Sequence, residues 1–192
     1  MPGKKFQSLR GTLLLDGGGL AGSCFQRTVV LVCEHSPAGA FGLVLNRISK
    51  PTLEDAVDPE IPEPICREPL FNGGPVQEGV LQFLYVPPGP VADPAPGNIM
   101  DTLRVGRRME ELEALAAGWT VSLKIRLFAG YAGWSPGQLD GELRRGSWLV
   151  HPAAMNLIFD VEPAALWRFI LRSRPNWQDR LLADAPEDLR SN

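Results

Sequence analysis

Residues 28–46, TVVLVCEHSPAGAFGLVLN, contain two apolar runs separated by a short turn. The first run, Thr28–Cys33, is continuous and rich in β-branched residues, which is typical of a strand buried on both faces. The second run, Phe41–Asn46, follows the turn residues 36–39, Ser-Pro-Ala-Gly. Because this connection is so short, we expect the two runs to be neighbouring antiparallel strands.

Further regular elements flank this pair. Strands are predicted at Thr12–Leu15, Val80–Val86, Ile99–Val105, Thr120–Leu127 and Ser147–His151, and helices at Arg107–Ala117, Pro136–Arg145 and Pro163–Arg172. Helical turns are predicted at Thr52–Asp55 and irregular chain at Asp58–Pro69. The alternation in 120–127 places Ser122, Lys124 and Arg126 on a solvent-facing side. Strands and helices do not alternate one for one, so the expected class is α+β with a mixed, mostly antiparallel sheet.

Length and composition fit a single domain over residues 1–192, ending in a C-terminal tail at 173–192. The 44% apolar fraction argues against disorder, and the net charge of −3 argues against a DNA-binding protein that works by bulk electrostatics. The sequence has no run near the roughly 20 apolar residues needed to cross a bilayer, and no secretory leader. We therefore expect a cytoplasmic protein without membrane contact.

Three cysteines are present, Cys24, Cys33 and Cys66. An odd number without a CxxC spacing is typical of neither a disulfide framework nor a zinc site. Cys33 lies in the first apolar run and is predicted to be buried and inert. Cys24 lies beside a glycine-rich loop and is the better candidate for a reactive thiol.

That glycine-rich loop matches a dinucleotide-binding spacing, with Gly17, Gly19 and Gly22 in a GxGxxG pattern. The dinucleotide site also needs a helix to begin at the loop, because the pyrophosphate rests on that helix's N-terminal amides. Here the chain continues instead into the strand at 28–33. A tight glycine loop is the interpretation that the sequence favours.

A second match, Gly133-Trp134-Ser135-Pro136-Gly137, fits the GxSxG spacing of a nucleophile elbow. The residue after the nucleophile should donate its backbone N–H to the oxyanion hole, and Pro136 has none. The same residues predict a helix start, with Ser135 as N-cap, Pro136 at the first helical position and Gln138 completing a capping box.

A third pattern extends over most of the chain. Its blocks keep their order from about residue 10 to 172 and are Phe25–His35, Gly39–Arg47, Asn72–Val76, Gly130–Leu139, Glu142-Leu143 and Ser147–Val150. Together they resemble the YqgE/AlgH family of bacterial proteins. The resemblance implies an α+β fold with a small barrel-like sheet flanked by helices, and no established enzymatic activity, although some members carry a regulator label. One departure is Leu84-Tyr85, where the family often has Leu-His.

Seven residues at strand ends and turns of these blocks are candidates for a binding site: His35, Asn46, Arg47, Gly73, Gly74, Tyr131 and Trp134. Arg47 could hold an anion through its fixed guanidinium donors, and the two glycines could present bare amides to one. Structural roles compete with each assignment: a hydrogen-bonded histidine, a turn asparagine, a tight glycine turn and core aromatics. His151, the other histidine, ends a strand and is expected to be structural. We predict no metal site, because no third ligand stands at a recognisable spacing, and no cofactor.

The sequence favours a non-catalytic cytoplasmic protein that binds a small molecule or a protein partner through these loops, and a regulatory role is one interpretation of such binding. The alternative is an enzyme of unrecognised type that uses His35 or Cys24, with Arg47 as an anion anchor. Nucleic-acid binding by Arg168, Arg172 and Arg174 is a third hypothesis, but a solvated helix face explains these arginines.

Overall fold

The computed structural model describes residues 6–49, 63–87, 97–100, 102–118, 120 and 122–186. Its strands are β1 (Thr12–Asp16), β2 (Val29–Ser36), β3 (Gly39–Val44), β4 (Leu70–Asn72), β5 (Val76–Tyr85), β6 (Asn98–Met100), β7 (Leu103–Gly106), β8 (Ile125–Trp134) and β9 (Trp148–Pro152). Its helices are a short 3-10 helix (Ile65–Arg67), α2 (Met109–Ala117), α3 (Gln138–Arg144), α4 (Met155–Phe159), α5 (Pro163–Ser173) and α6 (Trp177–Asp184). The helical turns predicted at Thr52–Asp55 lie outside the described residues.

The strands form one sheet in the order β6-β7-β5-β8-β3-β2-β1-β9. Strand β4 pairs in parallel with β8, and the other strand pairs are antiparallel. The predicted α+β class with a mixed, mostly antiparallel sheet is therefore confirmed. In the described chain the sheet is open, with β6 and β9 at its ends, so the barrel-like closure that the resemblance implied is not formed.

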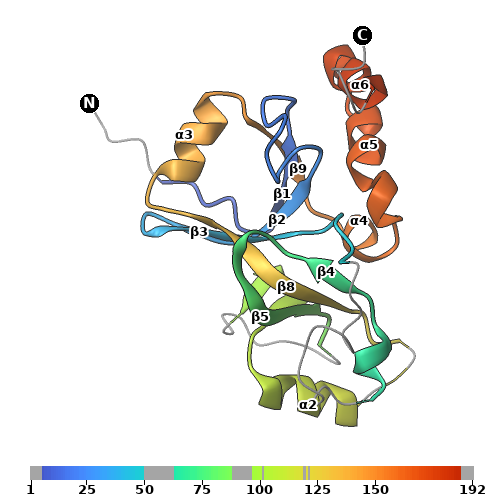
Figure 1. Ribbon diagram of the computed structural model, residues 1–192. Helices are drawn as coiled ribbons and strands as arrows, with labels where there is room; N and C mark the ends of the chain where they lie inside the picture. The colour runs from blue at the N-terminus through green and yellow to red at the C-terminus, as the bar shows by residue number, and fades with distance from the viewer. Residues whose placement is uncertain are drawn as a thin grey trace.

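The β2–β3 hairpin is confirmed, and both faces of β2 are buried as its sequence predicts. Val29, Leu31 and Cys33 face a core that includes side chains of α4, α5 and α6. Val30 and Val32 point the other way, into a core that contains Leu139 of α3. Figure 1 shows the result, with α3 on one side of β1 and β2 and the terminal helices on the other.

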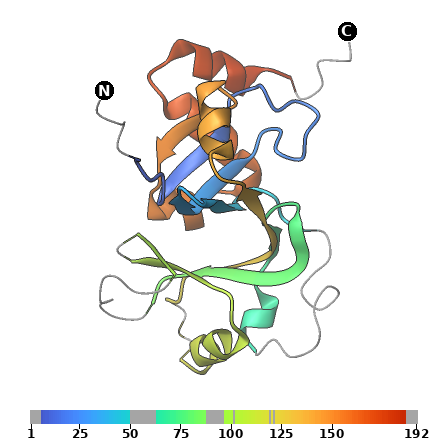
Figure 2. The ribbon, with the colours of Figure 1, turned by 90° about the vertical axis from the view of Figure 1, so that its left-hand side faces the viewer.

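The second half of the sheet contains β5, β7 and the lower part of β8. One face of it packs on α2, where Leu112 is fully buried against Phe83 and Leu127. The long strand β8 passes through both halves of the molecule (Figures 1 and 2). This strand therefore fixes the positions of β3, β4 and β5 relative to one another.

Two predicted strands differ in the structure. The strand predicted at Ile99–Val105 is a hairpin of β6 and β7, and the one predicted at Thr120–Leu127 begins only at Ile125. Arg126, expected in solvent, is 9% exposed and lies over the Phe71 ring at 4.7 Å. The pairing with β5 determines where β8 lies, and this tertiary contact outweighs the alternation of apolar and polar residues in 120–127 that predicted an earlier strand start and a solvent-facing Arg126.

Two helices that the sequence reasoning missed, α4 and α6, lie near the C-terminus. Helix α6 lies within the segment 173–192 that was expected to be a tail, and it packs against α5. Asn176 caps it by accepting a hydrogen bond from the Gln178 amide at 3.1 Å. This cap in the sequence is the signal that could have predicted the helix.

The start of α3 also differs from its prediction. Its N-cap is Gly137, in the left-handed conformation with φ of +71°, and the Ser135 hydroxyl makes no cap bond. Half of the predicted capping box is present, because the Ser135 amide donates to Oε1 of Gln138 at 3.0 Å. The left-handed turn at Gly137 moves the helix start two residues beyond Ser135, which leaves Pro136 outside the helix.

Candidate functional site

The glycine loop between β1 and β2 is organised by a buried carboxylate. Asp16 is 2% exposed, and its Oδ1 accepts the amides of Gly18 at 2.8 Å and Leu20 at 3.2 Å. Its Oδ2 accepts the Arg27 amide at 2.7 Å. Residues 17–28 contain turns and no helix, so the interpretation as a tight glycine loop is confirmed. The loop amides are directed at a protein carboxylate.

The far end of this loop is fixed to the C-terminal helices. Arg27 has a left-handed φ of +55°, and its guanidinium lies 5.3 Å from the Trp167 ring centroid. Its Nη2 donates to the carbonyl of Ala185 at 2.6 Å. The Trp167 indole in turn donates to the carbonyl of Asp16 at 3.1 Å. The loop, β1 and α5 thus hold one another in place.

Asn46 connects the same loop to the end of β3. Its Oδ1 accepts the Val29 amide and its Nδ2 donates to the Arg27 carbonyl, both at 2.9 Å. Its side chain is buried. This is the structural role that the sequence allowed for Asn46, because each amide group of the side chain satisfies one backbone group.

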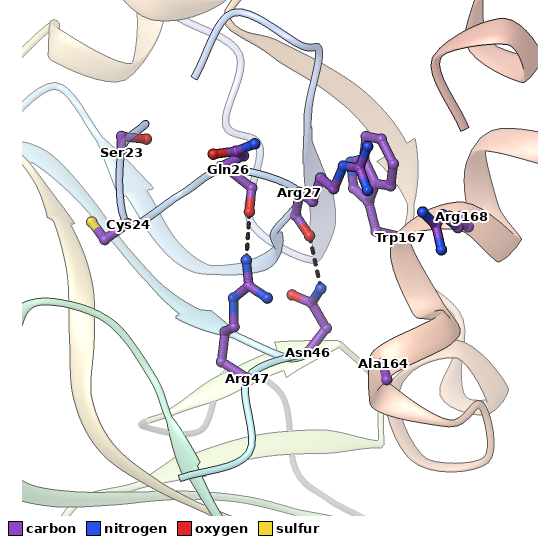
Figure 3. Close-up of a pocket in the computed structure, with 9 residues that line it drawn as sticks. All are labelled: Ser23, Cys24, Gln26, Arg27, Asn46, Arg47, Ala164, Trp167 and Arg168. Atoms are coloured by element: carbon purple, nitrogen blue, oxygen red, sulfur yellow. Dashed lines mark hydrogen bonds between the residues drawn. The ribbon is translucent and has the colours of Figure 1, made fainter. Parts of the chain in front are cut away.

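Loop, strand end and helix enclose a cavity of about 620 Å³, which we call the arginine pocket (Figure 3). Its lining residues are Ser23, Cys24, Gln26, Arg27, Asn46, Arg47, Ala164, Trp167 and Arg168. Three of these are arginines, one each from the loop, the end of β3 and α5, and none is acidic. Arg47 donates to the carbonyl of Gln26 across the cavity wall at 2.5 Å. The arrangement favours a negatively charged ligand.

Of the seven predicted site residues, Asn46 and Arg47 lie in this pocket. Gly74 lines a neighbouring cavity of about 330 Å³ that shares Cys24 and Arg47 with the first. The amide of Gly73 donates to the Ala129 carbonyl at 2.8 Å, and that of Gly74 to Oδ1 of Asn72 at 3.0 Å. Because both amides already donate to protein oxygens, the glycine pair acts as a tight turn.

Tyr131 and Trp134 line a separate cavity, beyond β3 and β8. The Trp134 indole donates to Oε2 of Glu142 at 2.9 Å, and the Trp148 indole donates to the same atom at 2.8 Å. The Tyr131 ring packs on Phe41 at 5.1 Å. The structure therefore divides the predicted residues between different surfaces.

His35 has a structural environment. It is 8% exposed, its Nδ1 accepts the Leu9 amide at 3.1 Å, and its ring packs edge-on against Phe6 at 4.9 Å. Its Nε2 lies 3.9 Å from Oδ2 of Asp140. These contacts fix the N-terminal segment against β2. Within the described chain, no group of three His, Cys, Asp or Glu side chains is placed to hold a metal ion.

The predicted burial of Cys33 is confirmed. Cys33 is 1% exposed, and burial raises the pKa of its thiol far above the ordinary value, so it stays protonated. Cys24 is exposed, and it and Arg47 both line the arginine pocket. Sequence reasoning did not place Arg27, Trp167 and Arg168 at the site, since they come together only when α5 packs against β1 and the loop.

We expect His151 to titrate below its ordinary pKa of 6.5, because partial burial and then the positive charge of Arg174 both disfavour its protonated form. The unfolded chain then binds more protons than the folded one, so His151 lowers stability as the pH falls below about 6.5. NMR titration can follow it directly, since the chain has two histidines. Arg174→Gln should raise this pKa, whereas Arg172→Gln, at an arginine that pairs with Asp184, should leave it unchanged. A pKa of 6.5 or higher in the native protein would contradict the assignment.

Comparisons with known proteins agree on the family. The family model described as DUF179, AlgH-like, matches residues 13–176. A UPF0301 protein of Chlorobium luteolum is 37% identical over 180 residues, covering 92% of this chain and 91% of the relative. A UPF0301 protein of Streptomyces avermitilis is 35% identical over 192 residues, covering 94% of each.

Solved structures extend the similarity to three dimensions. The solution structure of the AlgH protein from Pseudomonas aeruginosa is 29% identical, with a TM-score of 0.70, and the match covers 95% of this chain and 99% of that one. A crystal structure of a protein from Corynebacterium diphtheriae has the same fold, with a TM-score of 0.70 at 24% identity and 95% of each chain covered. The resemblance found in the sequence is confirmed, and the chain belongs to the AlgH-like UPF0301 family.

Proposed function

We propose that the protein is a non-catalytic cytoplasmic binding protein with a regulatory role, and that its arginine pocket takes a small anionic ligand. The observation that carries the proposal is the set of three arginines around a cavity in which none of the described lining residues is a carboxylate. Among the described helices none is long and apolar enough to cross a membrane.

The contacts of the arginines support an anion rather than a neutral ligand. The polar contact described for Arg47 is with the neutral carbonyl of Gln26, and no carboxylate among the described residues pairs with it. Guanidinium groups bind carboxylate and phosphate with paired donors, and such charged hydrogen bonds are stronger than neutral ones. Binding would connect the glycine loop, β3 and α5, and a partner protein could recognise that change.

Two alternatives can be compared with the same geometry. An enzyme would rely on Cys24, which lines the same pocket as Arg47, because His35 is held by the N-terminal segment. Nucleic-acid binding would need accessible arginines on α5 and just beyond it, but Arg172 pairs with Asp184 at 2.6 Å and Arg174 with Asp179 at 2.6 Å. If the protein is an enzyme that uses Cys24, the Cys24→Ser variant should lose catalytic activity. The proposed function predicts instead that this variant still binds anions.

The test is thermal unfolding in inorganic phosphate or pyrophosphate at constant ionic strength. We expect the anion to raise the melting temperature of the native protein, since a ligand that binds only the folded state stabilises it. Arg47→Ala should weaken binding roughly tenfold or more, as expected when a charged hydrogen bond is lost. Each variant is compared with its own melting temperature without anion.

Arg67→Ala is the matched control. Arg67 is exposed, pairs with Glu63 at 3.0 Å, and is outside the pocket lining, so its removal should leave the anion effect intact. Equal anion effects in all three proteins, or no effect in the native one, would contradict the proposal.

A further inference from the structure

A second cavity, of about 520 Å³, lies between β3, β5 and β8, and we call it the aromatic cavity. It forms where β5 leaves the sheet. Val76 pairs with Tyr131 and Leu81 pairs with Ala129, so an advance of five residues along β5 corresponds to only two residues along β8. The intervening residues bulge outward, with Gln77 at a φ of +50°. Such a bulge leaves an open space over the surface of β8.

One wall of this cavity contains a buried polar group without a partner. Gln82 is 2% exposed, and its Oε1 has no hydrogen-bond partner in the described part of the chain. Buried acceptors are bonded as a rule, and leaving one unsatisfied destabilises the folded protein. Gln82 lines the cavity but its Oε1 is covered, so a ligand that brings a donor would satisfy this atom once the side-chain amide turns toward the cavity.

The remaining walls determine what else the ligand must be. Phe41 and Tyr131 offer two tilted rings 5.1 Å apart. At the rim, the Arg107 guanidinium lies 4.2 Å from the Phe41 ring and 3.1 Å from the Glu34 carboxylate. The rim charges therefore neutralise each other, and the unpaired carbonyl oxygen of Gln82 disfavours an anion. This chemistry differs from that of the arginine pocket.

We propose that the aromatic cavity binds a small neutral aromatic molecule that carries an N–H donor. Its ring lies against Phe41 and Tyr131, and its N–H donates to Oε1 of Gln82. Contact between the ligand ring and the aromatic side chains stabilises the complex. The ligand N–H also supplies Oε1 of Gln82 with a hydrogen bond that this atom does not have in the free protein. This site is independent of the anion pocket.

The experiment compares indole with benzofuran, which has the same shape but an oxygen in place of the N–H. Ligand-observed NMR gives both dissociation constants. We expect indole to bind about tenfold more tightly than benzofuran, since one otherwise unsatisfied acceptor distinguishes them. Equal binding, a preference for benzofuran, or no binding of either probe up to its solubility limit would overturn the proposal.

Two variants make the test specific to this cavity. Gln82→Met keeps the side-chain length but removes the acceptor, so the preference for indole should disappear while the melting temperature without ligand rises. Gly133→Leu should abolish binding of both probes, because its Cβ would lie 3.2 Å from the Tyr131 ring and 3.7 Å from Val76, both in the cavity lining.

Gln178→Met, on the exposed surface of α6, is the control and should change neither the probe affinities nor the melting temperature. If Gly133→Leu does not fold, the indole preference of Gln82→Met still tests the proposed site. A Gln82→Met protein that keeps the indole preference, or that melts earlier than the native protein, would show that Oε1 is not the unsatisfied acceptor of a ligand site.

Discussion

Replacing Gly74 with alanine is expected to destabilise the protein by about 4 kcal/mol, one of the largest effects of any single substitution in this fold. Gly74 has a φ of +146°, a conformation that L-residues rarely adopt. An added Cβ would also lie 2.3 Å from the carbonyl carbon of Tyr131 and 2.4 Å from the nitrogen of Ala132. Both contacts are with backbone atoms of β8, which cannot move without disturbing its pairing with β3, β4 and β5.

Urea unfolding followed by circular dichroism measures this effect as a shift of the midpoint. Gly79→Ala is the matched control, because Gly79 lies in β5, which begins just after the Gly73-Gly74 turn, and an added Cβ there meets nothing within 4 Å. It should change stability by no more than about 0.5 kcal/mol. Equal midpoints for the two variants would mean that the Gly73-Gly74 turn is not held against β8.

Features of the fold that depend on residues close together in the sequence could be predicted from the sequence. The β2–β3 hairpin follows from two apolar runs and the turn between them, and α5 follows from its apolar stripe and the proline at its start. The position of β8 could not be predicted in this way. The alternation before Ile125 looks like a strand, but β8 lies where β5 and β3 can pair with it.

The candidate sites show the same division. Asn46 and Arg47 were found because they end a predicted strand, and the structure places both in the arginine pocket. Arg27 and Trp167 are 140 positions apart in the sequence, and only the packing of α5 brings them together. Gln82 had no signal at all, because a glutamine within a predicted strand becomes unusual only when the packing leaves its oxygen without a partner.

The second large effect is expected at Asp16, the carboxylate that holds the glycine loop. Asp16→Ala removes the acceptor of three backbone amides, those of Gly18, Leu20 and Arg27. Hydrogen bonds to a charged group contribute roughly 1.5–3 kcal/mol each and are not additive within one network, so we expect a loss of about 3 kcal/mol. Asp16→Asn keeps one carbonyl oxygen and should lose less.

The control and the second measurement separate loop order from general stability. Asp160→Ala removes an exposed carboxylate paired with Lys124 and should cost no more than about 1 kcal/mol. Phosphate affinity is then measured on Asp16→Asn at a temperature where it is folded. Because Asp16 positions the backbone of Arg27, the affinity should fall although Asp16 is outside the pocket lining. An unchanged affinity would mean that Arg27 is placed by its contacts with Trp167 and Ala185 alone, and that the glycine loop serves the fold rather than the site.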